Sequence, residues 1–112
     1  MIKWLKSFFS RLFTSGIIAK IAIARILKNN PRHAARIAAT AQAALSTLPS
    51  MVNVNGLEFL LKKKAGYGEL LPEERLLFEE VLAAIRADLE ARSVVTFDAA
   101  PLLKWLAQQG AA

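Results

Sequence analysis

Apolar and polar positions follow helical spacing through most of the 112-residue chain. Over residues 2–13 the apolar side chains fall at positions 2, 4, 5, 8, 9, 12 and 13, and polar side chains fill the positions between them. Intervals of three and four residues place apolar side chains on one face of a helix, so the pattern predicts an amphipathic helix here. Thr14, Ser15 and Gly16 then favour a break before the next element.

The next two helices are predicted over 17–28 and 31–47, on either side of Asn29-Asn30-Pro31. The Asn30 side chain is expected to cap the second of these helices, and Pro31 suits its first position because proline has no amide hydrogen to leave unpaired. The alternation at 21–24 also suits a strand, but the alanine content and the length favour a helix. Isoleucines lie on both sides of helix 17–28, so we expect neighbouring elements to enclose it. The seven alanines between 34 and 44 predict that another helix packs closely on helix 31–47.

The second half of the chain predicts three more helical segments. A connector at 49–56, with Val52 to Val54 suited to a short extended piece, leads to a helix that ends near residue 65, for which Asn55 and Glu58 resemble a capping box. Pro72 and the acids after it begin the longest helix, which is expected to run to about residue 92 with Phe78 on its core face. Residues 93–97 look extended, and Asp98 is expected to cap a final short helix that ends at Gly110.

These elements predict an all-α fold of about five helices, a small helical bundle with an amphipathic N-terminal helix. The length suits one modest core. We divide the chain into a basic, Ile-rich N-terminal segment, 1–28, and a helical core domain, 31–112, centred on helices 31–47 and 72–92. Arg11 and Lys20 interrupt the apolar stretch near the N-terminus, which argues against a secretory signal and against a transmembrane helix.

Charge is distributed unevenly along the chain. Residues 1–57 hold eight Lys and Arg side chains and no acid, whereas residues 58–112 hold seven Lys and Arg side chains and nine acids. The hydrophobic content of 54% exceeds the usual range for a soluble domain, and the excess lies in Ala, Ile and Leu. Together these features predict that the N-terminal half meets an anionic or apolar partner surface.

Candidate catalytic chemistry is sparse. His33 is the single histidine and the chain has no cysteine, so no second His or Cys is present to share a metal. The pairs Glu73-Glu74 and Glu79-Glu80 are expected to form a solvated helix face, and His33 to be exposed or partly packed. Gly66-Tyr67-Gly68 lacks the strand and the following Lys of a phosphate loop. We therefore expect no enzyme, no cofactor and no metal; the absence of cysteine leaves the compartment undetermined.

The candidate site is the predicted N-terminal helix. Its apolar face is expected to make the partner contact, with cations at the lipid or acidic rim: Trp4, Leu5, Phe8, Phe9, Leu12 and Phe13 with Lys3, Lys6 and Arg11. The sequence favours a non-catalytic assembly subunit that docks into a homo-oligomer, a larger complex such as a virus particle, pore or secretion machine, or an anionic membrane surface. An ordinary core helix stays open as the alternative for this segment. A basic nucleic-acid-binding module is the alternative function, disfavoured because the cations are scattered among isoleucines and alanines.

Overall fold

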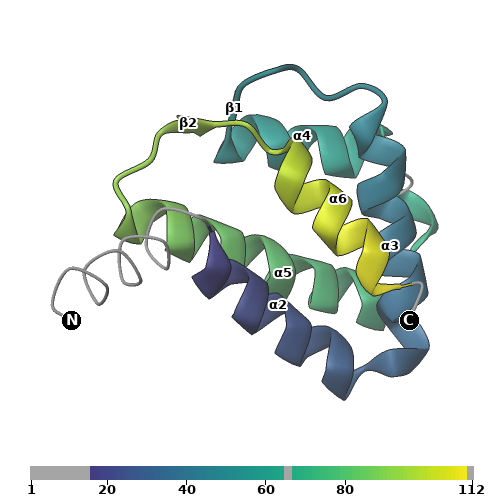
Figure 1. Ribbon diagram of the computed structural model, residues 1–112. Coiled ribbons are helices and arrows are strands. Elements are labelled where there is room, and N and C mark those ends of the chain that lie inside the picture. Colours follow the sequence, from purple (N-terminus) through teal and green to yellow (C-terminus); the bar gives the residue numbers. More distant parts are fainter. Residues whose placement is uncertain (1–15, 65–66, 111–112) are drawn as a thin grey trace, which may run out of the picture.

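A computed structural model describes residues 16–64 and 67–110 of the chain (Figure 1). Within this part the fold is all-α, as the sequence predicts, with a single short pair of strands. The elements in chain order are α2 (Ile17–Asn29), α3 (Pro31–Leu45), β1 (Val52–Asn53), α4 (Val54–Lys64), the 3₁₀ turn η1 (Tyr67–Glu69), α5 (Pro72–Ala91), β2 (Thr96–Phe97) and α6 (Ala100–Gln109). The predicted helix over 2–13 lies outside the described residues.

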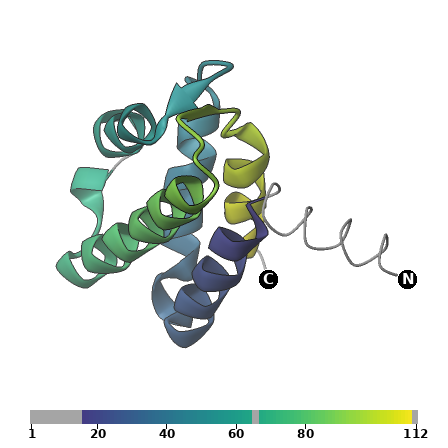
Figure 2. The same ribbon diagram turned by 90° about the vertical axis from the view of Figure 1, so that its left-hand side faces the viewer.

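The helices form two packed pairs around one core. α2 lies along α5, and α6 packs against α3, while α4 sits at the opposite side of the molecule from α2 (Figures 1 and 2). Both pairs contribute to the same cluster of buried side chains, in which Ile23 of α2, Ile37 of α3, Phe78 of α5 and Leu103 of α6 are fully enclosed. α2 therefore buries one stripe in the common core, and the division of the chain after residue 28 stays a prediction.

The Ala-rich face of α3 receives α6, which confirms the expected close approach of a second helix. Ala41 and Ala44 of α3 are fully buried, and the most extensive helix contact of α3 is with α6. At the end of α6, a Cβ added to Gly110 would meet the Ala38 Cβ at 2.5 Å and the Ala35 Cα at 3.0 Å. Only a residue without a side chain fits this separation, because real Cβ atoms do not approach other carbons so closely.

Two predicted helix caps are wrong in detail. The Asn30 side chain donates to the carbonyl oxygen of Ile26 at 2.8 Å, so it closes the end of α2 and does not cap α3. α4 begins at Val54, and the Gly56 N–H donates to the Asn53 side chain at 2.7 Å. Asn and Asp side chains can serve either helix at a boundary, and spacing alone does not decide between the two uses.

Hydrogen bonds and strand pairing fix the connector between α5 and α6. Ser93 adopts a left-handed φ of 56°, and the Val94 N–H donates back to the Leu89 carbonyl at 2.9 Å, which stops α5. Phe97 then pairs with Val52 across the antiparallel β1–β2 ladder. Asp98 accepts a hydrogen bond from the Ala100 N–H at 3.1 Å, but the N-cap residue of α6 is Ala99, so Asp98 lies one residue before the predicted capping position. Phe97 is thereby fixed between the two helices.

Candidate functional site

All nine residues of the predicted contact face lie within residues 1–15, outside the described part of the chain. The first described element after them is α2, which carries the same combination of apolar and basic side chains. One side of α2 faces the core, where Ala19, Ile23 and Leu27 are buried at four-residue intervals. The opposite stripe contains the features that bear on partner binding.

This outer face of α2 consists of Ile18, Ile21, Arg25 and Lys28, whose spacing places them on one side of the helix. Ile18 is 46% exposed and Ile21 is 52% exposed, and both cations are exposed. The expectation that neighbours enclose this helix is therefore wrong for its outer face in the described structure. Isoleucines on opposite sides of a helix need not face the same partner. In α2 one side packs in the protein's own core, and the other side is open to a second partner.

The described residues of α2 and α3 include no acid. Arg32 and Arg36 of α3 are also exposed, and the first acid along the described chain is Glu58 of α4. The acids concentrate on α4 and α5, where Glu58 pairs with Lys62 at 2.9 Å and with Arg86 at 3.0 Å. Although α2 packs along α5, the charges on its own outer face are all positive, which favours attraction of this face to an anionic surface.

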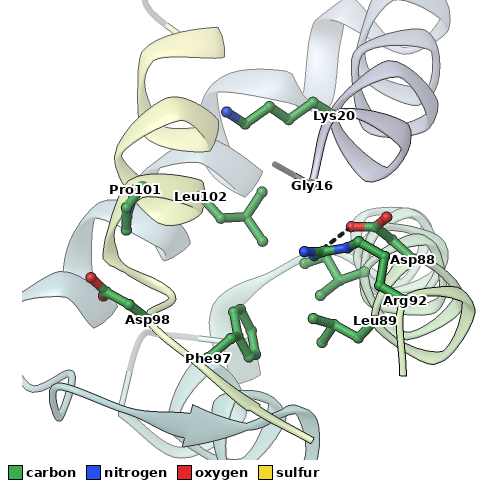
Figure 3. Close-up of a pocket in the computed structure, with 10 residues that line it drawn as sticks. Gly16, Lys20, Asp88, Leu89, Arg92, Phe97, Asp98, Pro101 and Leu102 are labelled. Carbon is green, nitrogen blue, oxygen red and sulfur yellow. Dashed lines mark hydrogen bonds and ion pairs between the residues drawn. The ribbon is translucent and has the colours of Figure 1, made fainter. Parts of the chain in front are cut away.

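A second feature is a cavity of about 290 Å³ between the N-terminal ends of α2 and α6 and the C-terminal end of α5 (Figure 3). Its walls combine apolar and charged side chains from four elements. They are Gly16, Lys20, Ile85, Asp88, Leu89, Arg92, Phe97, Asp98, Pro101 and Leu102. Gly16 has a φ of 74°, so the chain enters α2 through a left-handed residue at the edge of this space.

Charged groups in the cavity wall are held in place. Arg92 donates to the Asp88 carboxylate at 3.0 Å, and their side chains are 15% and 4% exposed. The sequence predicts this pair from its four-residue spacing, but not its burial. The Lys20 amine lies 5.9 Å from the centre of the Trp105 ring, a cation–π contact that holds the side chain between α2 and α6.

The space is partly open to solvent and is lined by charged as well as apolar groups. Water therefore fills it when no ligand is bound. The cavity is therefore a site from which a suitable molecule can displace solvent.

The third feature is a buried carboxylate at the contact between α3 and α5. The Glu74 side chain is 1% exposed; it accepts hydrogen bonds from the His33 Nδ1–H at 2.8 Å and from the Leu71 N–H at 2.9 Å. Arg36 lies 3.7 Å from the same carboxylate. The expectation that Glu73 and Glu74 both form a solvated face is wrong for Glu74, because the first turn of α5 points this residue at α3.

The environment of Glu74 keeps it ionised. Burial raises the pKa of its carboxyl, but the hydrogen bond from Leu71, the hydrogen bond with His33 and the charge of Arg36 together lower that pKa below its ordinary value. One sequence signal marks this position: Glu74 is the third residue of a helix that starts at a proline, where a glutamate reaches back to the preceding N–H. Nothing in the sequence near Glu74 indicates that His33 is its hydrogen-bond partner.

Charged residues on the facing sides of α4 and α5 are also paired. Lys62 lies 2.8 Å from Glu79, and Arg86 lies 3.0 Å from the Asn55 side chain. The hydrogen bond with Lys62 lowers the pKa of Glu58, although burial opposes it, and Arg86 adds to the lowering. The side chains of the four charged residues are 28% to 44% exposed, so the network stabilises the α4–α5 contact only modestly.

No three His, Asp or Glu side chains in residues 16–64 and 67–110 are grouped so as to hold a metal ion. None of the helices in these residues has the length and apolar content to span a bilayer. Comparisons with protein-family models, with curated proteins and with solved structures gave no match to this chain.

Proposed function

We propose that this protein is a non-catalytic interaction subunit that attaches to an anionic membrane surface through its N-terminal region. The observation that carries the proposal is the outer face of α2, where Ile18 and Ile21 remain about half exposed beside Arg25 and Lys28. Apolar residues flanked by cations are typical of helices that lie in the lipid interface. The predicted contact residues, from Trp4 to Phe13, carry the same pattern and precede this face in the chain.

Magnitudes support a lipid partner. Burying the exposed half of each isoleucine contributes about 1 kcal/mol, and each cation near an anionic bilayer contributes about 1 kcal/mol. The face on α2 therefore supplies on the order of 4 kcal/mol, which is a weak and reversible attachment by itself. The aromatic and basic residues of the predicted helix over 2–13 would add to it and make attachment stable.

Vesicle flotation tests the proposal. The full chain is mixed with vesicles of phosphatidylcholine alone or with 30% phosphatidylserine, and the floated fraction is measured at several salt concentrations. We expect flotation only with the anionic vesicles, weakened by salt. The double variant I18S/I21S should lower the partition constant roughly thirtyfold, the equivalent of about 2 kcal/mol.

Leu76 provides a matched control. It is 70% exposed, but it belongs to α5, where Glu73 and Glu80 lie beside it, and it is not part of the outer face of α2. L76S should float like the unmodified protein. Equal flotation with neutral vesicles, or an unchanged partition constant for I18S/I21S, would contradict the proposal.

Self-association is the second candidate, favoured by the exposure of Leu71 and Leu76 at the start of α5. Two exposed leucines flanked by acids suit a basic apolar partner, such as the N-terminal region of another copy. Light scattering at micromolar concentration should then report a multimer that L71S/L76S converts to a monomer. A monomer at every salt concentration would exclude this candidate, and salt-sensitive binding to duplex DNA without vesicle binding would favour the nucleic-acid alternative.

A further inference from the structure

The cavity between α2, α5, β2 and α6 is separate from the outer face of α2 and calls for its own explanation. Lys20 extends from α2 toward α6, and Phe97, Leu89 and Leu102 surround the space below it (Figure 3). The positions of these side chains are fixed by features already described, namely the Lys20–Trp105 contact and the β1–β2 ladder that holds Phe97. The walls are therefore preorganised, which favours binding of a small molecule.

The charges in the walls define the kind of polar group that fits. Asp88 is satisfied by Arg92, and Asp98 is engaged by the Ala100 N–H, with its carboxylate directed away from the centre of the space in Figure 3. In the described part of the chain, Lys20 makes no ion pair. The wall holds two cations and two carboxylates, but with Asp88 paired and Asp98 turned away, Lys20 is the charged group left to meet a ligand. A single anionic group suits a position beside it, whereas the nearby Asp88 would oppose a doubly charged group such as a phosphate monoester.

The rest of the wall is apolar and sets the size of the ligand. Ile85, Leu89, Phe97, Pro101 and Leu102 line it. A cavity of about 150 Å³ holds benzene, so by the same scale 290 Å³ holds a molecule of about ten to twelve non-hydrogen atoms. These features together describe an amphiphile with one negative charge and a short apolar body.

We propose that this cavity binds a small amphiphilic monocarboxylate, such as a medium-chain fatty acid. The carboxylate lies beside the Lys20 amine, and the apolar body packs on Phe97 and Leu102. At the rim, a Cβ added to Gly16 would lie 3.5 Å from a carboxylate oxygen of Asp88 and 3.7 Å from a guanidinium nitrogen of Arg92, so the paired charges lie beside Gly16. This site is independent of membrane attachment, since its residues do not include the outer face of α2.

Octanoate, with ten non-hydrogen atoms, is the probe. Titration calorimetry on the full chain at pH 7, without vesicles, should give one site with a dissociation constant of about 0.1–1 mM. Octanol, which has the chain without the charge, should bind at least tenfold more weakly, and octylammonium should not bind. In amide NMR spectra, octanoate should shift the signals of Gly16, Phe97 and Leu102 and leave those of Arg25 and Lys28 unchanged.

Three variants locate the site. K20M keeps the apolar stem and removes the charge, so it should weaken octanoate binding at least tenfold and leave octanol binding unchanged. K28M removes a lysine from the same helix outside the cavity and should bind octanoate normally. L102W fills the space and should abolish binding; if this variant fails to fold, the comparison of K20M with K28M decides the matter. Equal binding of octanoate and octanol, equal effects of K20M and K28M, or shifts centred on Arg25 and Lys28 would overturn the proposal.

Discussion

The buried carboxylate of Glu74 offers the sharpest test of the packing between α3 and α5. The substitution E74Q keeps the shape of the side chain and an oxygen that can accept from the Leu71 N–H, but it removes the negative charge seen by His33 and Arg36. A hydrogen bond to a charged group contributes about 1.5–3 kcal/mol, and a neutral one about 0.5–1.5 kcal/mol. In E74Q the Leu71 N–H donates to a neutral oxygen, and the amide NH2 that replaces the second oxygen can donate to the His33 Nδ1 in its other tautomer. Both hydrogen bonds are then neutral, and each loses about 1 kcal/mol.

Two smaller effects adjust this sum. Arg36 is largely exposed, so its attraction to Glu74 adds less than about 0.5 kcal/mol. Burying an amide costs less than burying a carboxylate, which offsets part of the loss. We expect E74Q to lower the free energy of unfolding by about 1–2 kcal/mol at pH 7, measured by urea denaturation followed by circular dichroism.

The matched control is E73Q, which changes the neighbouring exposed glutamate in the same helical turn. It should alter stability by less than about 0.5 kcal/mol. A double-mutant cycle with H33Q should give a coupling free energy of about 1 kcal/mol between the two positions. If E74Q is as stable as the unmodified protein, or if E73Q costs as much as E74Q, the reasoning is refuted.

The effect of E74Q also depends on pH, with a definite sign. The pKa of Glu74 in the folded protein is lower than its ordinary value of 4.5, so the folded state favours the ionised carboxylate. The stabilisation is complete above about pH 5 and is lost as the pH falls below 4.5 and through the folded pKa. Denaturation curves of E74Q and the unmodified protein should therefore converge in acid; a difference that persists undiminished would show that the charge of Glu74 is not its source.

The contact between α3 and α6 gives two further predictions. A41L adds three carbons at a fully buried position of α3 and should destabilise the protein by about 1–3 kcal/mol. A39L makes the same change on the exposed side of α3 and should change stability by less than about 0.5 kcal/mol. Thermal unfolding of the two variants measures the difference. G110A should lower the melting temperature by several degrees because the added Cβ meets Ala38. G68A, whose added carbon has no atom within 4 Å, should leave the melting temperature unchanged. Equal melting temperatures of the two variants would contradict the packing described at the end of α6.

Much of the helical architecture could be predicted because its signals are local. Pro31, Pro72 and Asp98 each mark a helix start from properties of a single side chain, and the observed helices begin at or close to these positions. The alanines of α3 likewise predicted a closely packed helix, because small side chains allow two helix backbones to approach each other. The amphipathic spacing of α5 predicted its buried line through Phe78 and Ile85.

The remaining features depend on residues far apart in the chain. His33 and Glu74 are 41 positions apart, and neither sequence neighbourhood indicates the other. The cavity is formed by four elements whose meeting point follows from the whole topology, so Lys20 and Phe97 could not be linked from their spacing. The exposure of Ile18 and Ile21 was missed because periodicity tells which residues share a side, but not which side has a neighbour.

The pairing of α3 with α6 also shapes how the chain acquires its structure. During synthesis, α6 is made after every other described helix, so the apolar side of α3 has no permanent cover while the intervening residues emerge. Nascent chains at this stage would present Ile37 and Ala41 to water. A messenger truncated before α6 would therefore yield a product prone to aggregate and to be degraded, and not a smaller version of the same fold.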